Sequence, residues 1–293
     1  MVARSGDRPE VVVAPGARLG ECPVWDSRSR RLVWVDVLAR QVHLTDVRTG
    51  SDEVFSVPLD IGAVVPRAAG GYVAALQDGF WVIGVGPPEL IARVPEAGPE
   101  IRFNDGKCDS AGRFWAGTMA YDESPGAGAL YRLGPDGRST RVLQGVTISN
   151  GMAWSPDTRT MYFIDSATHR IDAFAFDVST GELGDRRPLV HVPPEKGWPD
   201  GMTIDDEGGL WVALWRGSAV HRYFDGRLDR AISLPVSLPT SCAFGGAGLD
   251  ELYVTSATEG LSKRERAAEP LAGALFRVRP GVRGVAPASY VEV

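Results

Sequence analysis

The 293-residue sequence has few cysteines and no strongly basic segment. Its three cysteines, Cys22, Cys108 and Cys242, are odd in number and form no CxxC pair, which argues against a disulfide framework and a thiolate zinc site. We expect them to be reduced and buried. The chain carries 31 basic and 37 acidic side chains, a formal charge of −6, and its basic cluster at 263–266 is short. Nucleic acid is therefore not an expected partner.

Long apolar runs are also missing. No stretch approaches the roughly 18 apolar residues that a membrane-spanning helix needs, and residues 1–10 lack the apolar core of a signal peptide. We expect a cytoplasmic protein without a membrane partner. Helical patterns are nearly absent as well, because the one candidate, at 262–268, stops at Pro270 and is interpreted as a surface excursion.

The sequence is rich in turn residues, with 35 Gly and 21 Pro, and 44% of it is apolar. An aromatic residue followed by a small or β-branched one recurs six times, each time near the start of an alternating apolar stretch. The six pairs are Trp34-Val35, Tyr72-Val73, Trp115-Ala116, Phe163-Ile164, Trp211-Val212 and Tyr253-Val254. A period of about 45 residues suits four short strands with their turns, as in one blade of a propeller.

Six such units use nearly the whole chain, so we predict an all-β protein with a single domain over residues 1–293. The expected fold is a six-bladed β-propeller with four antiparallel strands per blade. Residues 1–10 are expected to form a flexible tail. The strand candidate at 11–14 precedes the first full unit and is predicted to close the last blade as its outer strand. A pair of β-sandwiches is the alternative, which the regular period disfavours.

Polar residues occupy the same position in four of the six units, about ten residues before the aromatic pair. They are Glu21, Asn104-Asp105-Gly106, Asn150-Gly151 and Asp200-Gly201. Because the first strand of each blade lies innermost, these positions should converge at one end of the central channel. Asn-Gly and Asp-Gly are also common turn sequences, but Glu21 is not a turn former. Two facing carboxylates, Glu21 and Asp200, are costly to bury unless a cation neutralises them.

Two carboxylates with asparagine oxygens form a hard, all-oxygen ligand set. We therefore predict one divalent metal ion in the channel. Ca²⁺ is expected first, with Zn²⁺, Mn²⁺, Mg²⁺ or Fe²⁺ as alternatives.

Several segments around these positions resemble the regucalcin/gluconolactonase family of sugar lactonases. They are LGECPVWD at 19–26, RFNDGKCDSAGRFWAGTM at 102–119, ISNGMAWSPD at 148–157, FIDS at 163–166, PDGMTIDDEGGLWVAL at 199–214, TSCAFGG at 240–246 and GVAPASY at 284–290. The resemblance runs in order from about residue 18 to the C-terminus. It implies a six-bladed propeller with one divalent metal in the channel.

The resemblance also implies site residues. Glu21, Asn150 and Asp200 would be the metal ligands, and Arg102 and Asn104 would bind the substrate. The family places an acidic residue shortly after the GTM segment to hold a sugar hydroxyl. Here that position reads Asp122, with Glu123 beside it, and either residue could fill the role.

The implied reaction is hydrolysis of a sugar lactone, in which a divalent ion polarises the carbonyl and activates a water. Asp200 is the candidate general base. Two other functions stay open: metal-dependent hydrolysis of another ester or an organophosphate, and calcium binding without catalysis, as in regucalcin. The expected partner is a small sugar lactone, and the protein is expected to be a monomer or a weak homo-oligomer.

Three further residues allow a structural and a functional interpretation. Asp36 and Asp165 follow repeat aromatics and could make turn hydrogen bonds or face the channel. Trp198 precedes Pro199-Asp200 and could either pack in a loop or form a wall that stacks on a sugar.

Overall fold

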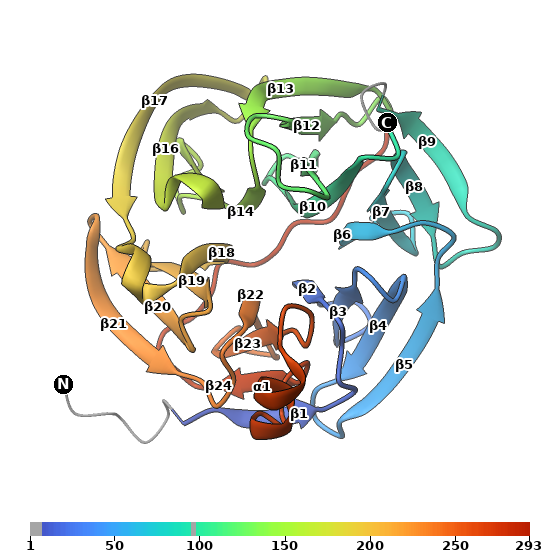
Figure 1. Cartoon of the computed structure of the whole chain (residues 1–293). Helices are drawn as coiled ribbons and strands as arrows, with labels where there is room; N and C mark the ends of the chain where they lie inside the picture. The colour runs from blue at the N-terminus through green and yellow to red at the C-terminus, as the bar shows by residue number, and fades with distance from the viewer. Residues whose placement is uncertain (1–7, 95–97) are drawn as a thin grey trace.

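The computed structural model describes residues 8–94 and 98–293. Within these residues the strands form six four-stranded sheets, and every pairing between neighbouring strands is antiparallel. Figure 1 shows the sheets arranged as blades around a common centre. The predicted six-bladed β-propeller is thus confirmed.

Within the first three blades, each strand pairs with the next one along the chain, starting from the innermost strand. Blade 1 contains β2 (Gly20–Asp26), β3 (Arg31–Asp36), β4 (Gln41–Asp46) and β5 (Ser51–Ser56). Blade 2 contains β6 (Ile61–Pro66), β7 (Tyr72–Leu76), β8 (Gly79–Ile83) and β9 (Glu89–Arg93). Blade 3 contains β10 (Ile101–Cys108), β11 (Phe114–Ala120), β12 (Gly128–Leu133) and β13 (Ser139–Val146).

The later blades follow the same order and carry the few helical turns of the described chain. Blade 4 contains β14 (Ser149–Trp154), β15 (Thr160–Asp165), η2 (Ser166–Thr168), β16 (Arg170–Asp177) and β17 (Glu182–His191). After η3 (Pro194–Lys196), blade 5 contains β18 (Trp198–Ile204), β19 (Leu210–Trp215), β20 (Ala219–Phe224) and β21 (Arg227–Ser233). Blade 6 contains β22 (Pro239–Gly245), β23 (Glu251–Ser256), α1 (Lys263–Ala268) and β24 (Leu275–Val278). These helical segments are too short or too polar to cross a membrane.

The ring is closed by β1 (Glu10–Val13), which pairs with β24 and completes blade 6. The predicted closing strand is confirmed, with its start at Glu10. The Glu10 carboxylate also lies 2.8 Å from a guanidinium nitrogen of Arg277. Most of the tail expected at residues 1–10 lies outside the described residues.

The six repeat aromatics are all buried, as predicted for the packing between blades. The indole nitrogens of Trp115 and Trp211 donate to Asp109 and Asp205, at 2.8 and 2.7 Å. These aspartates lie just after the innermost strands of their blades, so each hydrogen bond ties an inner strand to the next one. The three cysteines are buried and free.

Of the two roles considered for Asp36 and Asp165, the structure shows the structural one, in which the carboxylate accepts backbone hydrogen bonds. The Asp36 carboxylate accepts hydrogen bonds from the backbone nitrogens of Arg18 and Leu19, at 2.8 and 3.1 Å. Asp165 accepts in the same way from the residues that lead into β14. Each carboxylate thus fixes the chain as it enters the innermost strand of its own blade.

All six innermost strands break their pairing with the second strand at the same level. In blade 5, Pro199 pairs with Leu214 and Met202 with Val212, so Asp200 and Gly201 lie in a β-bulge. The other five innermost strands show the same irregularity. A bulge bends the strand and re-aims its side chains. In blades 3, 4 and 5 the polar residues at the bulge, Asn104, Asn150 and Asp200, face the channel.

The Asn-Gly and Asp-Gly pairs are therefore not turns. Gly151 and Gly201 lie within β14 and β18, where the neighbouring blade comes very close. A Cβ atom on Gly151 would lie 2.6 Å from the Asp200 carbonyl oxygen, and one on Gly201 would lie 2.0 Å from Ser241 Oγ. These glycines permit the close approach of adjacent inner strands.

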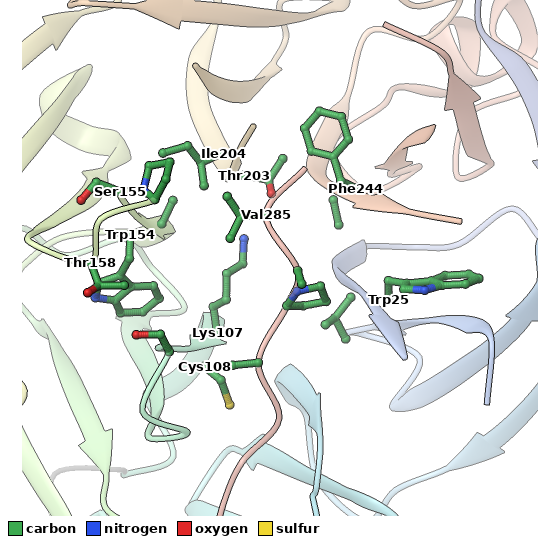
Figure 2. Close-up of a pocket in the computed structure, with 18 of the residues that line it drawn as sticks. Trp25, Lys107, Cys108, Trp154, Ser155, Thr158, Thr203, Ile204, Phe244 and Val285 are labelled. Carbon is green, nitrogen blue, oxygen red and sulfur yellow. The ribbon is translucent and has the colours of Figure 1, made fainter. Parts of the chain in front are cut away.

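The far end of the channel is covered by residues 284–290, which we call the strap. The strap crosses the centre of the ring (Figure 1) and hydrogen-bonds to several blades: Val285 N donates to Ile204 O at 3.3 Å and Tyr290 N to Pro66 O at 2.8 Å. Figure 2 shows Val285 between Lys107 and the apolar side chains of Ile204 and Phe244. The cavity left at this end is only about 110 Å³.

A substitution at Gly62 can test whether glycine is needed where adjacent inner strands approach closely, because no polar site residue lies at this position. A Cβ there would lie 2.3 Å from the Phe103 carbonyl carbon in the next blade. We expect Gly62→Ala to lower the free energy of unfolding by about 1–3 kcal/mol, measured by denaturant unfolding. Gly98→Ala is the control, because Gly98 has open space around its Cβ position and no positive φ. Equal stability of the two variants would contradict this interpretation.

Candidate functional site

A cavity of about 690 Å³ opens at the end of the channel opposite the strap. Its floor is made by the innermost strands at their bulges and next to them, which present Glu21, Arg102, Asn104, Asn150 and Asp200. Four blades thus bring together side chains that are up to 179 residues apart in the sequence, from 21 to 200. This is the convergence that the repeat predicts.

The carbonyl oxygen of the Asn150 side chain is buried and has no hydrogen-bond partner. Its orientation is fixed by Ser166, whose hydroxyl donates to the Pro199 carbonyl at 2.6 Å. The Ser166 oxygen can then only accept, and it does so from Asn150 Nδ2 at 3.0 Å. The Asn150 oxygen is therefore turned the other way and left free, and buried polar atoms without partners are rare.

Asn104 is held in a different way. Arg102 Nη1 donates to Asn104 Oδ1 at 2.7 Å and to the Phe103 carbonyl at 3.0 Å. Asn104 Nδ2 donates to the Ser149 carbonyl at 2.8 Å. Because a guanidinium only donates, the amide oxygen of Asn104 must face it. Of the two asparagines on the cavity floor, Asn150 is the one with a free carbonyl oxygen.

The carboxylates of Glu21 and Asp200 are both buried. Burial raises the pKa of each well above its ordinary value, and repulsion by the buried Asp105 carboxylate adds to this. Repulsion between Glu21 and Asp200 contributes as well. A hydrogen bond from the Asn150 side chain lowers the pKa of Asp200, and the charge of Arg102 lowers both pKa values, but burial outweighs these effects. A bound divalent cation would relieve this repulsion.

An ion at this position would need an amide ligand. Across the described residues, no three side chains of the His, Cys, Asp and Glu types lie together in a way that could hold a metal ion. Glu21 and Asp200 supply two carboxylates, and the free Asn150 oxygen supplies the third ligand. All three are oxygen donors, which hard cations prefer. The residues present thus fit a divalent cation.

Asp122 and Glu123 lie in the turn after β11, but they are placed differently. Glu123 is on the cavity wall, with a backbone φ of 57°. Asp122 is exposed, and its carboxylate accepts from the Ser124 backbone nitrogen at 3.0 Å. This hydrogen bond and the Ser124 hydroxyl lower the pKa of Asp122. Only Glu123 of the two lines the cavity.

Tyr121 and Ser166 also line the cavity, and neither was among the site residues predicted from the sequence. The Tyr121 hydroxyl donates to Asp60 at 2.6 Å, and burial together with this carboxylate raises the pKa of Tyr121 to about 12. Its ring lies 6.0 Å from the guanidinium carbon of Arg102. The place of Tyr121, two residues after the GTM segment at 117–119, is a sequence signal that could have found it. Ser166 has no such signal, because it acts through Pro199, a residue from the next blade.

Comparison with known proteins agrees with this fold. Residues 19–258 match the model of the SMP-30/Gluconolactonase/LRE-like region. Regucalcin of Danio rerio is 40% identical to the chain over 293 residues, which cover 98% of this chain and 99% of that protein.

Two solved structures extend the likeness to the whole fold. Regucalcin from Agrobacterium tumefaciens, a calcium-binding protein, has a TM-score of 0.91 and 30% identity, with 96% of each chain covered. A luciferin-regenerating enzyme has a TM-score of 0.88 and 33% identity, with 95% of this chain and 97% of that chain covered. The family match and these full-length likenesses together show that the chain belongs to the SMP-30/gluconolactonase/LRE-like family.

Proposed function

We propose that the protein hydrolyses a sugar lactone to the aldonic acid with the help of one divalent metal ion. The observation that carries this proposal is the buried, unpartnered carbonyl oxygen of Asn150 beside the Glu21 and Asp200 carboxylates. An all-oxygen donor set suits Ca²⁺ first, with Zn²⁺, Mn²⁺, Mg²⁺ and Fe²⁺ as alternatives.

When bound, the ion would supply Lewis-acid polarisation of the lactone carbonyl and would lower the pKa of a nearby water. Asp200 accepts a proton from the water as the water oxygen adds to the carbonyl carbon. The bond between the carbonyl carbon and the ring oxygen then breaks. The ring oxygen takes up the proton that Asp200 accepted and becomes a hydroxyl group, which gives the open aldonic acid and restores the Asp200 carboxylate.

The other floor residues would hold the substrate. Arg102 is fixed by the Phe103 carbonyl and Asn104, so its remaining N–H groups can donate to lactone oxygens without rearrangement. Asn104 Nδ2 keeps one N–H after its hydrogen bond to Ser149. Glu123 at the wall would accept from a sugar hydroxyl.

Two alternatives remain distinct from this proposal. Binding of calcium without catalysis would agree with the description of the Agrobacterium tumefaciens regucalcin as a calcium-binding protein. Metal-dependent hydrolysis of another ester or an organophosphate would use the same ion site. Hydrolysis of a sugar lactone is favoured because the ion site opens into a cavity of about 690 Å³ with a fixed guanidinium on its floor. A site built only to hold calcium needs neither feature.

Asp200→Asn should remove the proposed base and weaken metal binding. We expect kcat/KM for glucono-, galactono-, xylono- or arabinono-lactones to fall by at least about 100-fold. The rise in Tm on adding Ca²⁺ to chelator-treated protein should disappear. Proton release and thermal unfolding measure the two effects. Asp225→Asn is the control, since Asp225 lies exposed in a turn. Unchanged activity in Asp200→Asn would remove this residue from the mechanism.

Ser166→Ala tests the orientation of Asn150. Without the hydroxyl, Asn150 Nδ2 loses its hydrogen bond to Ser166, and we expect the dissociation constant for Ca²⁺ to rise by about ten-fold. Isothermal titration calorimetry measures this without any substrate. Ser256→Ala is the matched control, because Ser256 is also buried and donates to a carbonyl, that of Ala274 at 2.7 Å. An affinity equal to that of the control would rule out the positioning role.

Glu123→Gln and Asp122→Asn separate the two candidate acidic residues. We expect Glu123→Gln to raise KM for the preferred lactone by about ten-fold, because a hydrogen bond to a charged acceptor is lost. Asp122→Asn should change KM by less than about two-fold. Steady-state kinetics with both variants decides the matter, and the reverse result would assign the sugar contact to Asp122.

A further inference from the structure

Two tryptophans line the outer part of the cavity, away from its polar floor. Trp198 begins β18 and Trp215 ends β19, and the two residues pair directly across these strands. Trp198 is 42% exposed, although it is a large aromatic residue. The Trp198–Trp215 pair therefore forms an aromatic wall that continues the cavity toward its mouth.

The Trp198 ring is held in place from one side. It packs on the His169 ring, with 4.3 Å between the ring centroids and 40° between the planes. His169 is itself fixed by backbone hydrogen bonds, because its nitrogen donates to Ser166 O at 3.0 Å and its oxygen accepts from Val192 N at 2.8 Å. A rigid, backed aromatic ring that stays partly exposed is suited to stacking on a ligand.

Polar groups stand beside the aromatic wall at the same mouth. Arg216, Glu259 and Gly260 line the cavity and belong to the loops that follow β19 and β23. Arg216 lies 2.8 Å from Glu265 of α1 and also donates to the Gly260 carbonyl. Glu259 lies 3.1 Å from Arg18. The mouth thus offers apolar faces together with a carboxylate and a guanidinium that ion pairs hold in position.

We infer that the mouth is a subsite for a second sugar ring, so that the preferred substrates are aldonolactones that carry a glycosyl substituent. This inference rests on the proposed lactonase function. A pyranose ring has apolar C–H faces and hydroxyl groups at its edge, which match the aromatic wall and the groups of Arg216 and Glu259. The cavity of about 690 Å³ lies in the range that encloses ligands well above a single small ring.

A plain aromatic substituent fits this mouth less well. It could stack on Trp198, but it would leave Arg216 and Glu259 without hydroxyl partners. The subsite should therefore distinguish cellobiono-1,5-lactone from both D-glucono-1,5-lactone, which lacks the second ring, and dihydrocoumarin, whose second ring is aromatic.

The test compares these three lactones as substrates of the metal-loaded protein, by proton release. We expect kcat/KM for cellobiono-1,5-lactone to exceed that for D-glucono-1,5-lactone by about ten-fold, mainly through KM. Trp198→Ala should lower kcat/KM for the former by about ten-fold and for the latter by less than about three-fold. Trp198→Phe should restore most of the difference. Phe224→Ala is the control for losing an exposed aromatic residue, since Phe224 is 46% exposed and lies outside the cavity.

Equal kcat/KM values for the two sugar lactones, a preference for dihydrocoumarin, or an equal loss on both sugar lactones in Trp198→Ala would overturn the subsite. If no lactone is hydrolysed, the proposed function fails and the subsite is tested by binding alone. Tryptophan fluorescence should then show cellobionic acid binding about ten-fold more tightly than gluconic acid, a difference that Trp198→Ala removes. Equal binding of the two acids would reject the subsite without reference to catalysis.

Discussion

The structure depends on the close approach of six inner strands around one narrow channel. This crowding requires glycine where one inner strand touches the next, as at Gly62, Gly151 and Gly201. The same crowding coincides with a bulge in every inner strand, and the bulges direct polar side chains to one level of the channel. The polar floor is thus built from the positions where regular sheet pairing is interrupted.

The channel buries charge without fully neutralising it. Three carboxylates, those of Glu21, Asp105 and Asp200, are buried near one another, and the cations that act on them are Arg102 at the cavity and Lys107 toward the strap. Buried like charges are unfavourable in a low-dielectric interior. The Glu21 and Asp200 carboxylates line the same cavity as the free Asn150 oxygen, which gives a physical reason why this arrangement suits a cation.

The features that repeat along the chain could be predicted from the sequence. The residues that are positioned by contacts between blades could not. The period of the aromatic pairs fixed the number of blades, and the shared position of Glu21, Asn150 and Asp200 placed them at one level. The role of Ser166 depends on the Pro199 carbonyl, which belongs to the next blade. The meeting of Trp198 with His169 likewise follows from packing across a blade boundary. Such contacts between blades follow no regular spacing of residues, so no sequence pattern predicts them. The turn conformation that places Glu123 but not Asp122 on the cavity wall has no sequence pattern either.

The pairing of β1 with β24 has a consequence for how the chain is made. Blade 6 needs a strand from residues 10–13 and three strands from residues 239–278. During synthesis β1 therefore stays unpaired until β24 has left the ribosome, when almost the whole polypeptide has been made. Blades 1 to 5 can form as they emerge, but the ring cannot close before translation is nearly complete. Until that point the edge of β1 is an unpaired strand edge in the nascent chain, which is a site where strands of other chains can add.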